Sequence, residues 1–536
     1  MARASRRPRL LVLALTACSA AEPGGPLPIG VAPASVATPS AAAEPAAPPP
    51  FFSDVRVDLV IRGGTVCDGS GKPCVVTDVA VRGDRIVHVG SVEPRQLAAR
   101  TIDAKGLVVA PGYIDAHAHT DPLGSVEHLL AMGVTTIVVG QDGSSPDERI
   151  KAYLDRVDES RPRVNVATLV GHATVRSQEG LGMKTTLDQA EIDRMAARVQ
   201  KALDDGAFGL STGLEYDPGS AAGPVELARI AEPVGKRGGV VMSHLRSEDD
   251  DKVEAAIDEL LAQCEASKAK AHVAHIKVVL GKGEARARKV LADLQRARDR
   301  GLTVTADVYP YVASYTTLAI LFPAYARPPN NYRAALTKQK KRLLEDLEKR
   351  VMARNGPAAT RFGTGKLAGR TLEEAAREQG RPFEDLLAEL GPNGGSAAYT
   401  VMDETVVSAF VKDPFVMFGT DGSATSPHPR GAGTFAEIMR FVANGELALP
   451  TFIRKASALP AETLGLDMRG KLEAGAFADV IVFDEKRVAA RASFDKPQEQ
   501  ATGMRWVVVN GVVEWADGKA SGRGGKALRK RAAPAR

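Results

Sequence analysis

Short apolar runs rich in β-branched residues alternate with helical stretches through the middle of this 536-residue chain. Such alternation is typical of βα units, in which successive strands lie parallel to one another. Eight such units close into a (β/α)8 barrel, whose chemistry lies at the C-terminal ends of the strands. We therefore predict an α/β fold of this kind. The runs occupy residues 113–119, 134–140, 164–171, 207–213, 240–245, 271–277, 302–311 and 415–421.

The segments around these runs divide the chain further. We assign 111–467 to the barrel, in which 312–413 is too long for one crossover helix and is expected to be an insertion that caps the barrel mouth. The flanks, 51–110 and 468–518, both look like short strands separated by glycine turns. They are expected to pair into one small β-sandwich domain built from both ends of the chain.

The N-terminal residues have the pattern of an export signal. Residues 1–17 hold four arginines and then a short apolar run, which is too short to span a bilayer. The run ends in Leu-Thr-Ala-Cys at Cys18, which resembles the bacterial lipobox, where the cysteine carries a lipid. The alternative is an ordinary secretory peptide with an incidental cysteine. We expect an exported lipoprotein of the cell envelope, on the periplasmic side or at the outer membrane, held to the membrane by the lipid anchor only.

Two further segments bear on partners. Residues 18–50 are rich in Ala and Pro and should form an extended tether. Residues 519–536 hold seven basic and no acidic side chains, with Gly, Ala and Pro between them, which predicts disorder. The net charge of +5 falls to +1 without the four arginines of 1–17, and to −6 when the tail is discounted as well. A nucleic-acid partner is therefore not expected.

Histidines gather where the predicted strands end. His117 and His119 close the first strand, and side chains two residues apart in a strand point to the same face. His244, His275 and Asp421 stand at the ends of three other strands. An isolated His-x-His pair is often a surface pair, but four histidines and a carboxylate at one end of a barrel predict a metal centre.

At these residues the chain resembles the amidohydrolase superfamily, and within it the N-acyl-D-amino-acid deacylase (D-aminoacylase) branch. The resemblance covers about 58–515, and two stretches, GLSTGLEYDPG at 209–219 and DVYPY at 307–311, are specific to the branch. The other matching stretches are PGYIDAHAHTD at 111–121, GHATVR at 171–176, SHLRSE at 243–248, HIK at 275–277, GTDG at 419–422 and HPR at 428–430.

The resemblance implies a metal-dependent hydrolase with one or two zinc ions. His117 and His119 would hold one metal position, and His244 and His275 the other. Where the branch often has a cysteine, this chain has Asp142, a harder ligand that can also bridge two ions; alternatively, it is a loop carboxylate that caps a helix.

The resemblance also assigns roles in the reaction. Asp421 would accept a proton from the attacking water and return it to the leaving amine, and His172 is a weaker candidate for polarising the carbonyl. Lys277, Tyr309 and Arg430 are the implied donors to the substrate carboxylate; alternatively, they are solvated charges and a packed tyrosine.

The implied reaction is hydrolysis of the amide bond of N-acyl-D-amino acids, small molecules that yield a D-amino acid and a carboxylate. Another amidohydrolase activity, on cyclic amides or dipeptides, is the nearest alternative. A surface lipoprotein without catalysis is a third, against which the retained histidines argue.

Cys67 and Cys74 flank a six-residue turn between two short predicted strands. In an oxidising compartment such a pair can form a hairpin disulfide.

Overall fold

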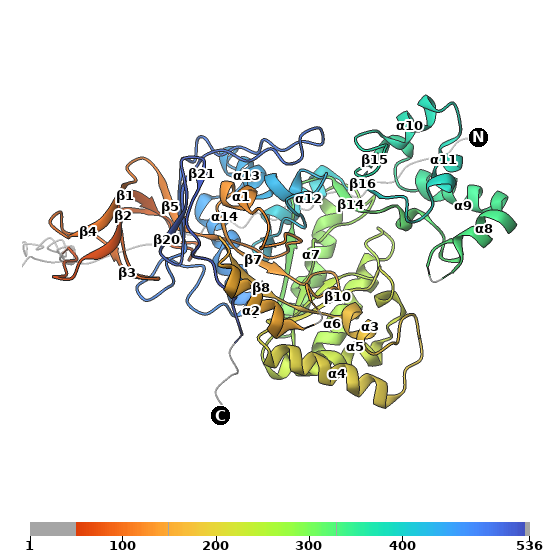
Figure 1. Ribbon diagram of the computed structural model, residues 1–536, viewed down its shortest axis with the longest axis horizontal. Coiled ribbons are helices and arrows are strands. Elements are labelled where there is room, and N and C mark those ends of the chain that lie inside the picture. The colour runs from red at the N-terminus through yellow and green to blue at the C-terminus, as the bar shows by residue number, and fades with distance from the viewer. Residues whose placement is uncertain (1–49, 148, 329, 531–536) are drawn as a thin grey trace, which may run out of the picture. The chain divides into compact units, whose positions relative to one another are not determined.

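The computed structural model describes residues 50–147, 149–328 and 330–530, so the predicted signal peptide and all but the last residue of the tether lie outside the described residues. Eight parallel strand positions form the barrel (Figure 1). The ring closes between its first and last strands, where the Ala116 amide donates to the Phe418 carbonyl at 3.3 Å and Ala118 bridges to Gly422. The strands are β6 (Tyr113–Asp115), β7 (Val134–Val139), β8 (Asn165–Thr168) with its continuation β9 (Val170–Gly171), β10 (Gly209–Gly213), β11 (Val240–His244), β12 (Lys270–Val273), β13 (Val304–Val308) and β17 (Val416–Phe418).

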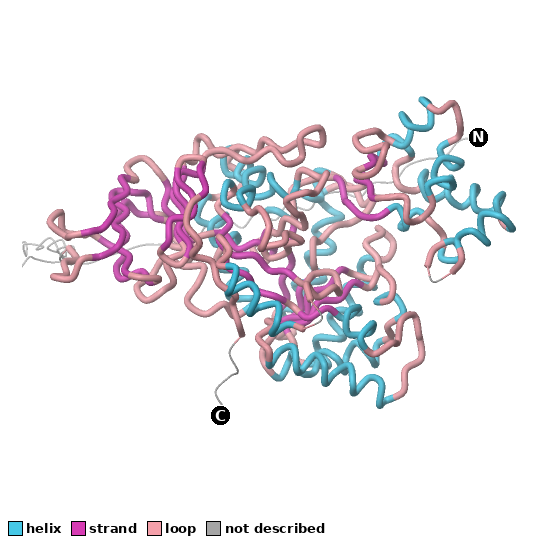
Figure 2. The backbone as a smooth tube through the Cα atoms, viewed as in Figure 1, coloured by secondary structure: helices cyan, strands magenta, loops and turns pink. Residues whose placement is uncertain are grey.

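Helices follow the strands and cover the barrel, as Figure 2 shows. In α4 the Asp188 carboxylate accepts the Glu191 amide, and the Glu191 side chain accepts the Asp188 amide, a capping box that starts the helix. Its buried residues recur every three or four positions, so one face packs inward. The helices are α1 (Glu127–Ala131), α2 (Ile150–Ser160), α3 (His172–Gln178), α4 (Gln189–Asp204), α5 (Pro224–Lys236), α6 (Val253–Ser267), α7 (Glu284–Asp299), α12 (Glu404–Lys412), α13 (Arg430–Ala443), α14 (Leu449–Ala456) and α15 (Ala458–Leu464). In the part of the chain that is described, no helix has the length and apolar character needed to cross a membrane.

Strands from both ends of the chain share one nine-stranded sheet. Its seam is the antiparallel pair of β18 with β5, in which Val480 lies opposite Pro111 and Phe483 opposite Val108. Alternate residues of β18 face the β-domain core and the barrel core, which attaches the two bodies. The strands are β1 (Val57–Val66), β2 (Val75–Arg82), β3 (Arg85–Gly90), β4 (Ala98–Asp103), β5 (Val108–Pro111), β18 (Val480–Phe483), β19 (Met504–Val509), β20 (Val512–Ala516) and β21 (Lys519–Ala520).

The insertion between β13 and β17 is shorter than the sequence predicts. Helix α12, placed within 312–413, packs beside α7 and β17 as an ordinary barrel helix, because its apolar face is turned toward the barrel. The preceding residues form a separate body around the small sheet β14-β16-β15 (Figure 1). Its elements are β14 (Ala313–Thr317), α8 (Tyr332–Lys338), α9 (Lys340–Met352), β15 (Thr360–Phe362), α10 (Leu372–Glu378), α11 (Phe383–Leu390) and β16 (Ser396–Thr400).

A disulfide joins Cys67, just after β1, to Cys74, just before β2. The crosslink closes the turn between two paired strands of the β-domain. Cys264 is buried in α6 and is the one free cysteine of the described residues.

The prediction of disorder from residue 519 onward is wrong for 519–530. Strand β21 pairs with β20, and the chain then runs beside β8, where the Val166 amide donates to the Lys526 carbonyl at 2.9 Å and the Leu528 amide donates to the Val166 carbonyl at 2.8 Å. The basic side chains find acidic partners, with Arg529 Nη1 2.6 Å from Asp158. The prediction rested on the composition of the tail alone, which does not show that its residues find partners elsewhere in the chain. Residues 531–536 lie outside the described part.

Deleting 524–536 should destabilise the protein. The Gly524 amide donates to the buried Glu514 carboxylate, and Asn510 Nδ2 donates to the Gly524 carbonyl at 2.7 Å. Their loss leaves the buried Glu514 carboxylate without its amide donor, whereas Asn510 Nδ2 keeps its bond to Asn165 Oδ1, so the unfolding free energy should fall by about 2 kcal/mol. The thermal midpoint reports this change. Deleting only 531–536 is the control, and equal midpoints for both deletions would contradict the docked tail.

Candidate metal centre and active site

The Asp142 carboxylate, in the loop after β7, lies within reach of four imidazoles. Its Oδ1 is 3.4 Å from His117 Nε2, 3.7 Å from His244 Nδ1 and 3.5 Å from His275 Nε2. Its Oδ2 is 3.2 Å from His119 Nε2. The carboxylate therefore stands between the two histidine pairs, where a ligand that bridges two positions would stand.

Asp421, which follows β17, lies in the same cluster. Its Oδ1 lies 3.3 Å from His119 Nε2 and 3.8 Å from His117 Nε2. The structure thus brings together all six side chains that the sequence places at the metal centre and at its proton-transfer position. They come from the ends of β6, β7, β11, β12 and β17.

The spacing and chemistry of these atoms fit a divalent metal ion. Ligand atoms about 2.1 Å from a tetrahedral ion are about 3.4 Å apart, close to the separations found here. Moreover, His117 Nε2, His244 Nδ1 and Asp142 Oδ1 are buried and have no hydrogen-bond partner among the described residues. Buried polar atoms are rarely left unpaired, so these atoms are arranged for a ligand that the protein itself does not supply.

The backbone is strained at the same positions. Asp142, His275 and Asp421 have φ angles of 53°, 34° and 47°, in the left-handed region that residues other than glycine seldom adopt. Such strain persists only where the surrounding structure imposes it, and it is concentrated at functional sites. The chain packs closely beside Asp142, since a Cβ on Gly213 would lie 2.2 Å from the Asp142 carbonyl oxygen.

Three of the histidines have a carboxylate at the nitrogen that faces away from the cluster. Asp307 lies 3.5 Å from His117 Nδ1, Glu215 lies 3.1 Å from His244 Nε2, and Glu248 lies 3.2 Å from His275 Nδ1. Glu215 can accept the N–H of His244 Nε2, so that His244 Nδ1 keeps its lone pair for the metal. Asp307 and Glu248 act on His117 and His275 as nearby negative charges, and His275 Nδ1 also lies 2.6 Å from Lys277 Nζ. The exception is His119, whose side chain is 40% exposed.

The sequence prediction missed these three carboxylates. Glu215 and Glu248 lie in loops after β10 and β11, where residue spacing does not reveal a direction. Asp307 could have been identified from the sequence, because it is an acidic residue inside the apolar strand β13, where it is fully buried. A charged residue in such a strand requires a buried partner, and here His272 Nε2 supplies one at 2.8 Å.

Opposite charges hold the cluster together. Burial alone would lower the pKa of His244, but Glu248, Asp142 and Glu215 outweigh it and raise that pKa to about 10. Burial alone would raise the pKa of Asp421, but Arg430 and the neighbouring imidazoles bring it below its ordinary value. Since metal ions and protons compete for the same nitrogens, binding of a metal must displace protons.

The three predicted donors to substrate lie beside the cluster. Arg430 Nη1 is 2.6 Å from Asp421 Oδ2, and its guanidinium lies 4.8 Å from the centre of the Tyr309 ring. The Tyr309 hydroxyl is buried and has no partner among the described residues. Lys277 Nζ is 2.6 Å from Glu248 Oε1, so this lysine already has a carboxylate partner.

The structure does not bring His172 to the cluster. This residue begins α3, is fully buried, and holds its Nε2 2.7 Å from Glu226, which also pairs with Arg176. It does not line the cavity, so the role predicted for it at the carbonyl is not supported by its position. The sequence predicts a strand that ends at residue 171, directly before His172. In the structure His172 is the first residue of the helix that follows.

A cavity of about 550 Å³ opens above the cluster, a volume suited to a small molecule. The insertion supplies part of its wall. Many of the lining side chains carry hydroxyl groups. They include Ser314, Tyr315, Thr316, Thr317, Thr364, Ser396, Ser423, Thr425 and Ser426.

Known proteins share this sequence and architecture. The amidohydrolase family model matches residues 100–384 and 367–513. An N-acyl-D-glutamate deacylase of Alcaligenes xylosoxydans xylosoxydans is 34% identical, over 89% of this chain and 97% of its own, and a D-aminoacylase of the same organism is 33% identical, over 89% and 98%. The crystal structure of N-acyl-D-glutamate deacylase from Bordetella bronchiseptica, complexed with zinc and a phosphonate inhibitor, has a TM-score of 0.77 at 32% identity and covers 89% of this chain and 100% of its own.

These similarities confirm the predicted fold class and the resemblance read from the sequence. The strand-end histidines and the two branch-specific stretches lie within the matched residues. This chain belongs to the amidohydrolase family, in its N-acyl-D-amino-acid deacylase branch.

Proposed function

We propose that this protein is a metal-dependent hydrolase that cleaves the amide bond of N-acyl-D-amino acids, giving a D-amino acid and a carboxylate. The observation that carries the proposal is the cluster of four imidazoles around Asp142, with Asp421 and Arg430 at its edge. Relatives at 33–34% identity are named for this activity, toward D-glutamate, D-amino acids and D-aspartate.

The metal we propose is zinc, as one or two ions. His117 and His119 would hold one position, His244 and His275 the other, with Asp142 between them. Imidazole and carboxylate ligands suit zinc, and a related structure contains it. When bound, such an ion acidifies a water molecule and polarises a carbonyl group.

Asp421 is the residue placed to move the proton. An amine leaves readily only when protonated, so one group must take a proton from the attacking water and return it to the nitrogen. Asp421 is held by Arg430 at 2.6 Å. A substrate carboxylate that binds Arg430 would share this guanidinium, and Asp421 would then become a stronger base as its own partner is drawn away.

The substrate carboxylate would bind at the Arg430 side of the cavity. The guanidinium can donate two parallel hydrogen bonds, and the unpaired Tyr309 hydroxyl can donate a third. Lys277 contributes positive charge, although it must share that charge with Glu248. These fixed donors would orient the amide over the metal centre.

The alternative activities are less well supported. Cyclic-amide hydrolases such as the L-hydantoinase of Arthrobacter aurescens are only 15% identical, with a TM-score of 0.53, a likeness of fold alone. A protein without catalytic activity would not require a strained backbone at the cluster, nor buried ligand atoms that have no hydrogen-bond partner among the described residues.

We also propose that the protein is an exported lipoprotein anchored through Cys18. The support is the sequence pattern of residues 1–18 alone, which lie outside the described part. The disulfide between Cys67 and Cys74 fits an oxidising compartment.

A panel of N-acetyl-D- and N-acetyl-L-amino acids tests the activity. Zinc-loaded protein should release free amine from D-substrates in preference to their L-enantiomers. The donors that bind the substrate carboxylate and the metal centre are fixed in position, so only one enantiomer can place its amide correctly. Amine release measured with a ninhydrin-type reagent is sufficient. Absence of D-selective hydrolysis would overturn the proposal.

Asp421→Asn should lower kcat by about 10²-fold to 10⁴-fold, the usual contribution of a proton-transfer group. The amide cannot take up the proton, whereas the four imidazoles and Asp142 remain to bind metal. Turnover and metal content are measured on the same sample. Asp251→Asn, at a side chain 78% exposed, is the matched control. Unchanged turnover would exclude Asp421 from proton transfer.

Asp142→Ala should reduce the bound metal, since it removes the carboxylate that approaches all four imidazoles. Asp142→Cys should retain zinc and shift the preference away from harder ions such as Mn²⁺, because a thiolate is a softer ligand. Elemental analysis after dialysis against mixed metals measures both effects. If Asp142→Ala binds metal as the unchanged protein does, Asp142 is not a ligand.

Labelled fatty acid should enter the protein when it is produced in a bacterial host, and Cys18→Ser should abolish the label. The serine lacks the thiol that carries the lipid, while the rest of the signal is kept. Gel fluorescence of the labelled protein measures incorporation. Label that persists in Cys18→Ser would refute lipidation at this residue.

A further inference from the structure

Three buried polar side chains of the barrel strands β12 and β13 form a chain of contacts. Thr305 and Asp307 are two residues apart in β13 and share one face of it, and His272 lies opposite Thr305 in β12. His272 Nδ1 is 2.8 Å from Thr305 Oγ1, and His272 Nε2 is 2.8 Å from Asp307 Oδ2. A neutral imidazole has one donor and one acceptor nitrogen, so the hydroxyl can donate to Nδ1 while Nε2 donates to the carboxylate.

Asp307, at the end of this chain, reaches a ligand of each proposed metal position. Its Oδ2 lies 3.5 Å from His117 Nδ1, the nitrogen that faces away from the cluster. Its Oδ1 accepts the His275 amide at 3.0 Å, and its backbone carbonyl accepts the Ile276 amide at 2.7 Å. His275 is one of the residues whose backbone is in the left-handed region, with φ at 34°. One carboxylate therefore lies against the ring of His117 and against the strained backbone of His275.

The Asp307 side chain is tightly enclosed. It is fully buried, and a Cβ at Gly419 would lie 2.8 Å from Asp307 Oδ1 and 2.8 Å from His117 Cβ. Glycine at this position lets the end of β17 pass close to both side chains. A buried carboxylate is costly unless its oxygens have partners, and here His272 and the His275 amide supply them.

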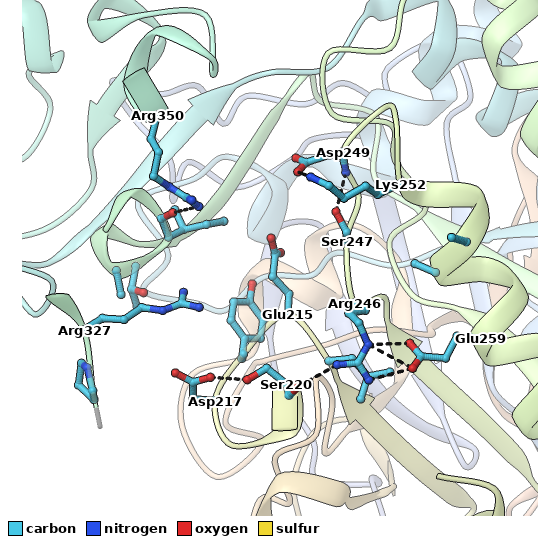
Figure 3. A pocket seen from close by; sticks show the side chains of 18 of the residues that line it. Glu215, Asp217, Ser220, Arg246, Ser247, Asp249, Lys252, Glu259, Arg327 and Arg350 are labelled. Carbon is cyan, nitrogen blue, oxygen red and sulfur yellow. Dashed lines mark hydrogen bonds and ion pairs between the residues drawn. The ribbon is translucent and has the colours of Figure 1, made fainter. Parts of the chain in front are cut away.

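Glu215, the carboxylate beside His244, differs from Asp307 in its surroundings. It is one of the side chains that line a cavity of about 990 Å³, as Figure 3 shows, and its side chain is 24% exposed. Its hydrogen bond goes to one imidazole, that of His244. Water from the cavity can therefore take the place of Glu215, whereas Asp307 is closed to solvent.

We propose that Asp307 and His272 are positioning residues that set the ligand geometry of both metal positions together. His272, fixed by Thr305, holds the Asp307 carboxylate in place, and Asp307 fixes the His117 ring and the backbone of His275. Negative charge beside the outer nitrogen of His117 also makes the inner nitrogen a better ligand. The inference rests on the metal centre of the proposed function, which it deepens by naming residues that act on the metal through its ligands.

Binding of cobalt(II) after removal of bound metal tests the proposal, because the visible absorption of cobalt reports both its affinity and its ligand geometry. His272→Ala removes the partner of Asp307, so it should weaken cobalt binding at least about tenfold and change the spectrum, as is usual for residues behind metal ligands. His272→Gln has an amide that can still donate to Asp307. It should restore most of the affinity and the spectrum, which a general loss of packing would not allow.

A combined variant shows whether His272 acts through Asp307. Asp307→Asn keeps an oxygen for the His275 amide and removes the charge beside His117, so it should also weaken cobalt binding at least about tenfold. Adding His272→Ala to Asp307→Asn should weaken binding further by less than about threefold, because residues that act as a unit are not additive. If the two losses multiply in full, His272 does not act through Asp307 and the proposal fails.

Two milder variants extend the test in case His272→Ala does not fold. Thr305→Val has a similar shape and loses only the hydroxyl that fixes His272, so cobalt binding should weaken about twofold to tenfold, as for one ordinary hydrogen bond. Glu215→Gln should weaken it less than Asp307→Asn does, since Glu215 is bonded to one imidazole and faces solvent.

His172→Ala is the control for lost stability. It removes another fully buried imidazole that pairs with a carboxylate, that of Glu226, away from the metal centre. It should lower the thermal midpoint, as His272→Ala does, but leave the affinity for cobalt and the spectrum unchanged.

Cobalt binding is measured without substrate, which separates this inference from the proposed function. Loss of affinity in His272→Ala with recovery in His272→Gln supports the positioning role even if no N-acyl-D-amino acid is hydrolysed, in which case only the proposed activity fails. If the unchanged protein binds no cobalt, the metal centre and this inference fall together. If it binds cobalt and His272→Ala, Asp307→Asn and Thr305→Val bind it equally well with the same spectrum, the inference alone is overturned.

Discussion

The carboxylate of Asp142, within 3.7 Å of four imidazoles, is the contact on which the arrangement of the active site depends. The four histidines come from strands far apart in the chain, and only a closed barrel brings their ends to one point. Positive φ angles at Asp142 and His275 then turn the side chains inward. The rigid barrel holds this strain, and outer carboxylates hold the rings, so the site is organised before any ligand arrives.

Charge balance links this centre to substrate binding. Asp421 touches the histidine cluster through Oδ1 and Arg430 through Oδ2, so one carboxylate joins the metal centre to the substrate donors. Glu248 joins His275 to Lys277 through one oxygen, Oε1. Each acid therefore has one partner at the metal centre and one on the substrate side, and an incoming carboxylate must change how those partners share their charge.

The sequence predicts the residues whose positions follow from strand periodicity and from the ends of strands. It does not predict the positions of residues that loop conformation or packing determines. His117 and His119 follow from their two-residue spacing, and the eight strands follow from the apolar runs. Glu215 and Glu248 lie in loops, so nothing local shows where they point. His172 was misjudged because the side chain belongs to the start of a helix, and the tail because its basic residues have partners far away in the chain.

The barrel and the insertion contribute different kinds of contact to the active site, for physical reasons. Metal ligands must be placed within fractions of an ångström, which strand ends can do and long loops cannot. Contacts to the rest of the substrate tolerate more variation, and an inserted body that lines the cavity can supply them without disturbing the barrel.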